Sequence, residues 1–228
     1  MPEKRKARCP VPQINKANHE SRGADATRFA RMEKGTHLVI LDRDGTINIE
    51  RNYLASVEGM ELLPGAAEAI RMINQLGCPV VVISNQPVVA RGDCSLETLH
   101  AIHQRMSALL ADEGAAVNAI YFCPHSPEDH CACRKPNTEL LEKARDVFHA
   151  DLSRSFVVGD KCSDIQAGRN TGAMTFLVRT GHGLETERAG QCQPHHVVND
   201  LKSAAERICD IIRGNIHDPA SISATALV

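Results

Sequence analysis

Short runs of consecutive apolar residues alternate along the chain with longer segments in which apolar residues recur every three or four positions. A continuous apolar run such as residues 79–83 (PVVVI) is typical of a strand in a parallel sheet, which is covered on both faces. The longer segments are typical of amphipathic helices, and Pro64 and Ser95 suit the starts of two of them. The predicted strands are residues 37–41, 79–83, 119–122, 155–158, 174–178 and 196–198. The predicted helices are residues 64–77, 95–113, 138–148, 163–170 and 201–213.

This alternation predicts an α/β fold with a doubly wound, Rossmann-like parallel sheet, helices on both faces and only small loops as caps. In such sheets ligands bind beyond the carboxyl ends of the strands, where the direction of winding reverses. Four predicted strands are followed directly by polar clusters, which we therefore expect to meet at one edge of the sheet. The clusters are residues 42–46, 84–86, 123–135 and 159–161.

We expect one folded domain, residues 35–214, between two tails. Residues 1–34 hold more basic than acidic side chains and few apolar ones, so we interpret them as a basic, flexible tail. Residues 215–228 are interpreted as a second tail. No apolar run approaches the roughly 20 residues of a membrane span, and no charged start precedes an apolar stretch. We therefore expect a cytoplasmic protein without membrane contact.

Composition excludes several kinds of partner. Among 228 residues, 26 are Lys or Arg and 28 are Asp or Glu, which gives a formal net charge of −2. A nucleic-acid-binding domain needs a basic surplus to neutralise phosphates, so we expect no nucleic-acid partner. An aromatic content of 3% also argues against the stacking of single-stranded bases. We expect a monomer that acts on a small molecule.

The segment Asp42-Arg43-Asp44-Gly45-Thr46 directly follows the first predicted strand. Two carboxylates two positions apart at a strand end can supply a nucleophile and a general acid or base, and the glycine permits a sharp turn. A turn that is simply rich in Asp and Gly is the ordinary alternative. The buried strand before the segment and the polar clusters after later strands favour a catalytic motif. We expect His100 and His103, on a predicted helix, to be surface or partly buried groups and not catalytic bases.

A second cluster combines thiols and imidazole in one short loop. Three cysteines and one histidine match a closed tetrahedral zinc site. Reduced surface thiols are the alternative, and His130 is a competing ligand; disulfides are less favoured because no secretory signal precedes the nine cysteines. We expect a structural ion that stiffens the loop carrying Arg134 and Lys135. The predicted Zn²⁺ ligands are Cys123, His125, Cys131 and Cys133.

The strand ends resemble those of the haloacid dehalogenase-like phosphatases. That family carries an aspartate pair after its first strand, Ser or Thr after the second, a later Lys, and an acidic cluster after the fourth. The resemblance covers about residues 37–183. The matching residues, in order, are Asp42 and Asp44, Ser84, Lys135, and Asp160 with Asp164.

The resemblance implies a Mg²⁺-dependent phosphatase with an aspartyl-phosphate intermediate. Asp42 would be the nucleophile and Asp44 the acid and base. Mg²⁺ would be bound by the Asp42 side chain, the Asp44 carbonyl and the Asp160 side chain. Ser84 and Lys135 would surround the transferring phosphoryl group. By the same resemblance, the aspartate at position 164 would orient the lysine or a metal-bound water.

The zinc-loop pattern Cys-x-His…Cys-x-Cys-Arg-Lys-Pro narrows the resemblance to the D-glycero-D-manno-heptose-1,7-bisphosphate 7-phosphatases and their histidinol-phosphatase relatives. The chain departs from the commoner heptose pattern at residues 84–89, where Ser-Asn-Gln-Pro-Val-Val replaces Thr-Asn-Gln-Ser-Gly-Ile. Pro87 removes an amide donor there, which leaves the preferred anomer open. The residues implied in substrate binding are Glu50, Arg51, Asn52, Tyr53, Ser84, Asn85, Gln86, Pro87, Arg134, Lys135 and Lys161.

The expected function is removal of the 7-phosphate from D-glycero-D-manno-heptose 1,7-bisphosphate, within bacterial lipopolysaccharide synthesis. Histidinol phosphate is the alternative substrate. A zinc-stabilised protein that binds a sugar phosphate without turnover is the alternative that is not an enzyme. The presence of both Asp42 and Asp44 weighs against that last alternative.

Overall fold

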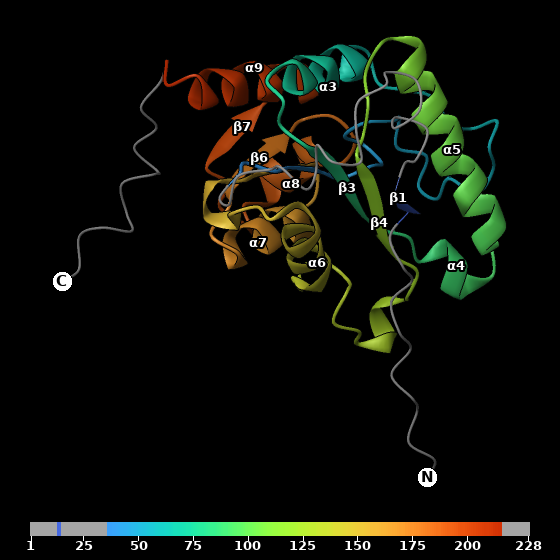
Figure 1. Cartoon of the computed structure of the whole chain (residues 1–228). Coiled ribbons are helices and arrows are strands. Elements are labelled where there is room, and N and C mark those ends of the chain that lie inside the picture. Colours follow the sequence, from blue (N-terminus) through green and yellow to red (C-terminus); the bar gives the residue numbers. More distant parts are fainter. Residues whose placement is uncertain (1–12, 15–35, 216–228) are drawn as a thin grey trace.

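The computed structural model of the protein describes residues 13–14 and 36–215, which contain one seven-stranded sheet (Figure 1). The strands are β1 (Gln13–Ile14), β2 (Val39–Leu41), β3 (Val80–Asn85), β4 (Ala119–Cys123), β5 (Phe156–Gly159), β6 (Met174–Val178) and β7 (His196–Val198). Their order across the sheet is β1-β4-β3-β2-β5-β6-β7. Strands β2 to β7 are parallel, and β1 runs antiparallel to β4.

The predicted α/β class is confirmed, because each of the six predicted strands overlaps an observed strand of the parallel sheet. Strand β1 is not among the predicted strands. It is two residues long, too short to show an alternation that a sequence pattern could reveal, and it lies within the predicted tail, residues 1–34. The rest of the two predicted tails, residues 1–12, 15–34 and 216–228, lies outside the described residues.

Helices cover both faces of the sheet (Figure 1). They are α3 (Ala66–Gln75), α4 (Val88–Arg91), α5 (Leu96–Asp112), α6 (Glu139–Phe148), α7 (Cys162–Asn170), α8 (Gly183–Ala189) and α9 (Leu201–Ile212), with 3₁₀ turns η1 (Pro127–Asp129) and η2 (Leu152–Arg154). Helices α3, α5 and α9 pack on one face, and α6 and α7 pack on the other. No helix in the described part of the chain is both long and apolar enough to cross a membrane.

Alternate residues of β2 and the position before it, residues 38–41, point to opposite faces of the sheet, and both sets are buried. Val39 and Leu41 belong to the apolar cluster beneath α3, α5 and α9. Leu38 and Ile40 belong to the cluster beneath α6 and α7. This two-sided burial explains why the strand sequences are continuously apolar and do not alternate with polar residues.

The helix starts follow local side-chain chemistry. Ser95 is the N-cap of α5, as predicted, and its hydroxyl accepts a hydrogen bond from the backbone N–H of Thr98 at 3.1 Å. Helix α3 begins at Ala66, two residues after the predicted start at Pro64. The intervening Gly65 has a φ of 77° and therefore precedes the helix as its N-cap.

The direction of winding reverses between β2 and β5. Strands β3 and β4 lie on one side of β2, whereas β5, β6 and β7 lie on the other. The carboxyl ends of β2 and β5 are therefore neighbours at the point where ligands bind in doubly wound sheets.

Replacing Ile73 by alanine should destabilise the domain, because this α3 side chain is fully buried in the cluster that also contains α9 and the sheet. Such truncations cost roughly 2–5 kcal/mol, which chemical denaturation followed by circular dichroism measures as lost unfolding free energy. The control is Gln75→Ala, at an exposed position of the same helix, with an expected change below about 0.5 kcal/mol. Equal losses in the two variants would refute this packing.

Candidate active site and metal centres

Three aspartates meet at the carboxyl ends of β2 and β5. Asp42 directly follows β2, Asp160 directly follows β5, and Asp164 lies in the first turn of α7. Their carboxylate oxygens lie within 4.8 Å of one another, and all three residues are buried. The sheet topology therefore brings together side chains that stand far apart in the sequence.

The ammonium group of Lys135 lies among these carboxylates. Its Nζ is 2.8 Å from Asp42 Oδ1 and 2.6 Å from Asp164 Oδ1, and it also donates to the backbone carbonyl of Ile83. Burial disfavours the charged form, but Asp164 and Asp42 outweigh that effect and raise the pKa of Lys135. The lysine is therefore charged at neutral pH. Its contact with Asp164 agrees with one of the two roles expected for that aspartate.

The negative charge of Asp160 is poorly balanced by the protein groups around it. Burial raises its pKa to about 8; Lys161 opposes this rise, whereas Asp42 and Asp164 add to it. Asp160 Oδ2 accepts a hydrogen bond from the backbone N–H of His182, but Oδ1 is buried without a hydrogen-bond partner among the described residues. Oxygen ligands of this kind suit Mg²⁺, so the donor set fits that ion.

Two glycines allow the chain to approach Asp160 closely. Gly45, with a φ of 78°, and Gly181, with a φ of 55°, are both left-handed. A Cβ atom at either position would lie 2.3 Å from Asp160 Oδ2. The hydroxyl of Thr180 joins the two segments by donating to the carbonyl of Gly45 at 2.6 Å. The glycine of the Asp-x-Asp-Gly-Thr motif is therefore needed for the turn and for the space beside the carboxylate.

Asp44 is bound to the arginine that precedes it in the sequence. Arg43 donates from Nε and Nη2 to Asp44 Oδ1 at 3.1 and 2.8 Å, and from Nη2 to Oδ2 at 2.6 Å. Asn48 donates to Oδ1 and Gln86 to Oδ2, both at 2.9 Å. Burial favours a higher pKa for Asp44, but the Arg43 charge and these hydrogen bonds hold it below its usual 3.8. The carboxyl group is therefore ionised in this arrangement.

The polar residues at the end of β3 and directly after it contact other parts of the site. The Ser84 hydroxyl accepts a hydrogen bond from Gln86 Nε2 at 2.7 Å. The Asn85 side chain accepts from the backbone N–H of Lys135 at 3.0 Å and donates to its carbonyl at 3.1 Å. Pro87 is buried and precedes α4 as its N-cap. In this structure the side chains of Asn85 and Gln86 are thus engaged with neighbouring site residues.

Glu50 and Lys161 form an ion pair at the edge of the aspartate cluster. Glu50 Oε2 accepts from Lys161 Nζ at 2.8 Å, and the same nitrogen is 3.9 Å from Asp160 Oδ1. His182 Nε2 lies 3.6 Å from that Glu50 oxygen. Burial opposes the charge on Lys161, but Asp42 and the two acidic neighbours outweigh it and raise the pKa of the lysine. The lysine side chain is 40% exposed, so a ligand can reach it.

The next three residues of the expected substrate segment lie farther out. Arg51 pairs with Glu61 at 2.8 Å, and both side chains are exposed. Asn52 has a φ of 60°. Arg91, the last residue of α4, places its guanidinium 4.3 Å from the centre of the exposed Tyr53 ring. This cation–π contact joins the segment after β2 to the helix after β3.

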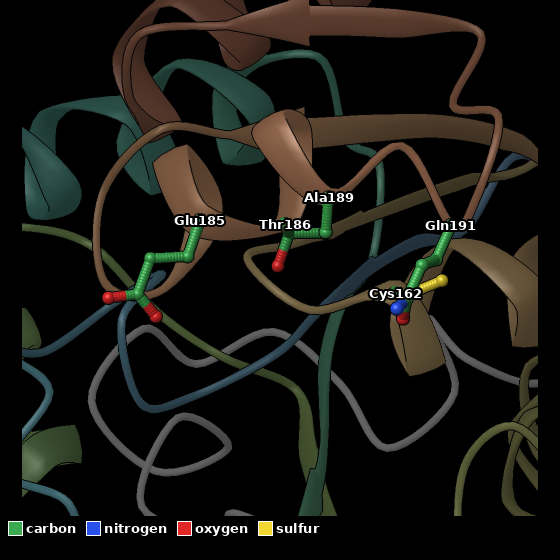
Figure 2. A pocket seen from close by; sticks show the side chains of 5 residues that line it. All are labelled: Cys162, Glu185, Thr186, Ala189 and Gln191. Carbon is green, nitrogen blue, oxygen red and sulfur yellow. The ribbon is translucent and has the colours of Figure 1, made fainter.

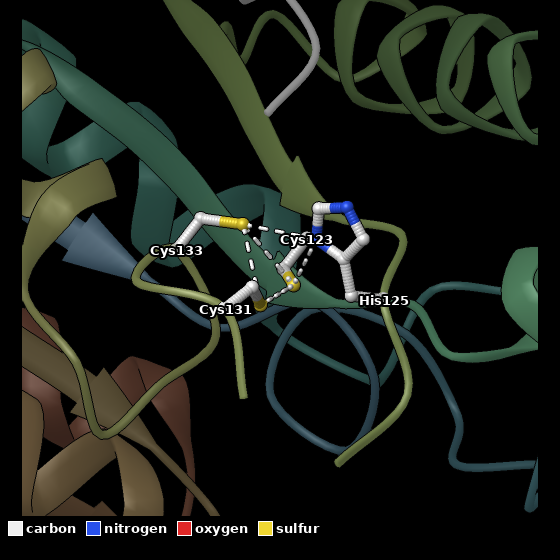
Figure 3. Close-up of side chains that lie close together, drawn as sticks. All are labelled: Cys123, His125, Cys131 and Cys133. Atoms are coloured by element: carbon white, nitrogen blue, oxygen red, sulfur yellow. Dashed lines mark hydrogen bonds between the residues drawn. The ribbon is translucent and has the colours of Figure 1, made fainter. Parts of the chain in front are cut away.

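Figure 3 shows the four predicted zinc ligands facing one another, Cys123 at the end of β4 and the other three in the loop after it. The sulfur of Cys123 is 3.4 Å from the sulfurs of Cys131 and Cys133, and 3.6 Å from His125 Nδ1. All four ligand atoms lie within 4.8 Å of one another. Three sulfurs and one imidazole nitrogen in this arrangement fit a tetrahedral Zn²⁺ site. His130 is exposed and lies outside the cluster.

The loop that carries the Cys/His cluster also carries two basic residues of the candidate site. Arg134 and Lys135 directly follow Cys133. Arg134 donates from Nη1 to the carbonyl of His125 at 3.3 Å, whereas Lys135 reaches the aspartates. An ion bound by the cluster would therefore fix the segment from which both basic side chains extend.

A pocket of about 220 Å³ lies beside α7 and α8 (Figure 2). Its lining residues are Cys162, Glu185, Thr186, Ala189 and Gln191. The Thr186 hydroxyl donates to the backbone carbonyl of Asp160 at 2.8 Å, so the pocket adjoins the segment after β5. None of the residues expected at the active site lines it.

Several residues that contact the site carry no predicted role, and three of them show what the sequence does not reveal. Arg43 stands inside the Asp-Arg-Asp motif, but the motif does not reveal that its guanidinium is buried. His182 reaches the site from the turn after β6 and has no motif of its own. The expectation of a surface or partly buried His103 is wrong: the residue is 1% exposed and contacts Phe122 and Arg43. Its place next to Ile102 on the apolar side of the helix is the signal that could have indicated burial.

Comparison with known proteins relates the chain to one family of phosphatases. A family model described as HAD-hydrolase-like matches residues 132–204. A relative from Thermosynechococcus vestitus, named D-glycero-D-manno-heptose-1,7-bisphosphate 7-phosphatase, is 41% identical over 185 residues, which cover 75% of this chain and 94% of the relative. A relative from Escherichia coli K12, named D-glycero-beta-D-manno-heptose-1,7-bisphosphate 7-phosphatase, is 36% identical and covers 68% of this chain and 86% of its own length.

A solved structure whose sequence identity is close to that of these relatives shares the fold. The crystal structure of D,D-heptose 1,7-bisphosphate phosphatase from B. bronchiseptica, complexed with magnesium and phosphate, matches with a TM-score of 0.74 and 37% identity. The match covers 77% of this chain and 99% of that one.

Metal analysis of the purified protein should find about one zinc ion per chain if the four-residue cluster binds it. Cys131→Ser and His125→Ala should each lose the ion and lower the midpoint of thermal unfolding, because the loop would lose its cross-link. His130→Ala removes a histidine of the same loop outside the cluster and should keep the ion. A wild-type protein that contains no zinc, or an equal loss of zinc in all three variants, would rule out this site.

Proposed function

Because this chain belongs to the D-glycero-D-manno-heptose-1,7-bisphosphate 7-phosphatase family of HAD-like hydrolases, we propose that it removes the 7-phosphate from D-glycero-D-manno-heptose 1,7-bisphosphate. The observation that carries the proposal is the buried group of Asp42, Lys135, Asp160 and Asp164 at the ends of β2 and β5. This group offers a carboxylate nucleophile beside fixed positive charge, which hydrolysis of a phosphomonoester requires.

Asp42 is the proposed nucleophile. Attack by one of its oxygens forms a bond to phosphorus while the bond from phosphorus to the sugar oxygen breaks, which leaves an aspartyl-phosphate. Lys135 holds Asp42 Oδ1 at 2.8 Å, so the carboxylate is oriented before substrate arrives. A water molecule then attacks the same phosphorus, releases inorganic phosphate and restores the Asp42 carboxylate.

Asp44 is the proposed acid and base. Because Asp44 is ionised in the free site, it would take up a proton from solvent as the anionic substrate binds. It would pass that proton to the sugar oxygen as the first bond to phosphorus breaks, and it would accept a proton from the attacking water in the second step. Ser84 and Lys135 are the proposed donors to the oxygens of the transferring phosphoryl group, where negative charge increases in the transition state.

The Asp42 and Asp160 carboxylates and the backbone carbonyl of Asp44 are the groups that would hold Mg²⁺. When bound, the ion supplies the positive charge that offsets repulsion between a carboxylate nucleophile and a dianionic phosphate. We propose a different task for Asp164, which pairs with Lys135 at 2.6 Å and orients that lysine.

Recognition of the rest of the substrate is assigned to the residues around the aspartate cluster. We propose that Arg134, Lys161 and the segment from Glu50 to Tyr53 contact the sugar and its 1-phosphate. Lys161 borders the cluster and is 40% exposed, which suits a group that meets an entering anion. The connection between β3 and β4 contains α4 and α5 as its helices, so no inserted cap domain covers the site from this part of the described chain.

We further propose that residues 35–214 form the catalytic domain and that the protein works as a cytoplasmic monomer in lipopolysaccharide synthesis. A zinc site with three cysteine ligands needs reduced thiols, so the proposed ion implies a reducing compartment. The large apolar side chains that are exposed in the described residues stand on separate segments of the chain, which supports a monomer. They are Tyr53, Leu96, Val147 and Leu184.

Phosphate release should show a kcat/KM about ten- to a hundredfold higher for D-glycero-D-manno-heptose 1,7-bisphosphate than for histidinol phosphate. The reason is the second phosphate, since each hydrogen bond to a charged group contributes about 1.5–3 kcal/mol. The α and β anomers are assayed separately, and Asp42→Asn, which should abolish turnover, is the control. A preference for histidinol phosphate would overturn the proposed substrate, and binding without turnover would favour the alternative that is not an enzyme.

A further inference from the structure

We propose that Arg43 and Gln86 are positioning residues that hold the Asp44 carboxyl group for proton transfer to the leaving sugar oxygen, and that His103 fixes Arg43. The inference rests on the proposed function, in which Asp44 is the acid and base. It gives a task to two residues without a predicted role. It also gives Gln86 a task other than the substrate contact expected from the sequence.

Arg43 is a fully buried cation that contacts Asp44, Gln86 and His103. Its Nε and Nη2 bind both carboxylate oxygens of Asp44, Nη2 also donates to Gln86 Oε1 at 3.1 Å, and Nη1 lies 3.3 Å from His103 Nε2. A buried charge is strongly destabilising unless it is paired and hydrogen-bonded. Arg43 therefore has little freedom to move, and neither has the carboxylate that it binds.

Gln86 joins Asp44 to the hydroxyl proposed to bind the phosphoryl group. Its Nε2 donates to Asp44 Oδ2 at 2.9 Å and to Ser84 Oγ at 2.7 Å, while its Oε1 accepts from Arg43. The residue is 3% exposed. Because the same amide nitrogen binds both Asp44 and Ser84, it sets the position of Asp44 relative to Ser84.

His103 gives Arg43 a fixed neighbour on α5. Its ring is buried, and its centre lies 5.5 Å from that of Phe122. Burial lowers the pKa of His103 well below 6.5, and Arg43 adds to this effect while Asp44 opposes it. The imidazole is therefore neutral, and an unprotonated Nε2 can accept a hydrogen bond from Arg43.

Position matters for Asp44 because a general acid must lie within hydrogen-bond reach of the oxygen that it protonates. A network that only stabilised the fold would affect all substrates alike. A network that positions the acid would affect substrates whose leaving group needs a proton, such as a sugar alkoxide. It would spare the first step with p-nitrophenyl phosphate, whose leaving phenolate needs no proton; the second step, in which Asp44 is the base, is the same for both substrates.

The test compares the Mg²⁺-loaded full-length protein on a sugar phosphate and on p-nitrophenyl phosphate. Gln86→Met keeps the length of the side chain but removes both hydrogen bonds to Asp44 and Ser84. We compare kcat/KM, which reports only the steps up to loss of the leaving group and excludes the shared hydrolysis of the aspartyl-phosphate. We expect kcat/KM to fall about ten- to a hundredfold for the sugar phosphate, within the range of general acid catalysis, and less than about threefold for p-nitrophenyl phosphate. In an Asp44→Asn background the same substitution should have no further selective effect.

Two additional variants make the result specific. Gln86→Glu keeps the acceptor for Arg43 but replaces the donor to Asp44, and it should reproduce the selective loss. Gln104→Met makes the same change at an exposed position of α5 and should leave both rates unchanged. Equal slowing of both substrates by Gln86→Met and Gln86→Glu would overturn the positioning role while leaving the proposed function intact. A wild-type protein that hydrolyses neither substrate would instead refute the proposed function.

Discussion

The ammonium group of Lys135 is the constraint on which the candidate site depends. It lies between the carboxylates of Asp42 and Asp164 and against the carbonyl of Ile83, so β2, β3 and α7 all converge on one nitrogen atom. Without it, three buried aspartates would face one another with little compensation, and unpaired buried charge costs several kcal/mol. The order of strands in the sheet therefore determines which charged groups meet at the site.

Lys135 belongs to no strand or helix, so its position depends on the loop before it. The Cys/His cluster lies at the end of β4 and in this loop, and Asn85 binds the lysine backbone from the neighbouring strand. A loop with little apolar burial needs such links to offset its ordering entropy. A metal-binding cluster that takes no part in the chemistry can thus influence the reactivity of Asp42.

The main features of the fold and the site could be predicted from the sequence because they depend on local patterns. Continuous apolar runs indicated the parallel strands, and topology then required the polar residues after them to meet, as Asp42 and Asp160 do. Contacts between side chains have no such local signal. Whether Arg43 turns inward, or whether Gln86 faces a substrate or Asp44, depends on packing across several elements. Strand β1 was missed because two residues form no pattern.

The central claim is that a carboxylate at the end of β2 carries the phosphoryl group for part of the reaction cycle. Rapid acid quenching during turnover, followed by borohydride reduction and peptide mass spectrometry, tests it most directly. Reduction converts a phosphorylated aspartate to homoserine, and the account predicts this residue at position 42 alone. Homoserine at another position, or its absence from every peptide while phosphate is being released, would contradict the account.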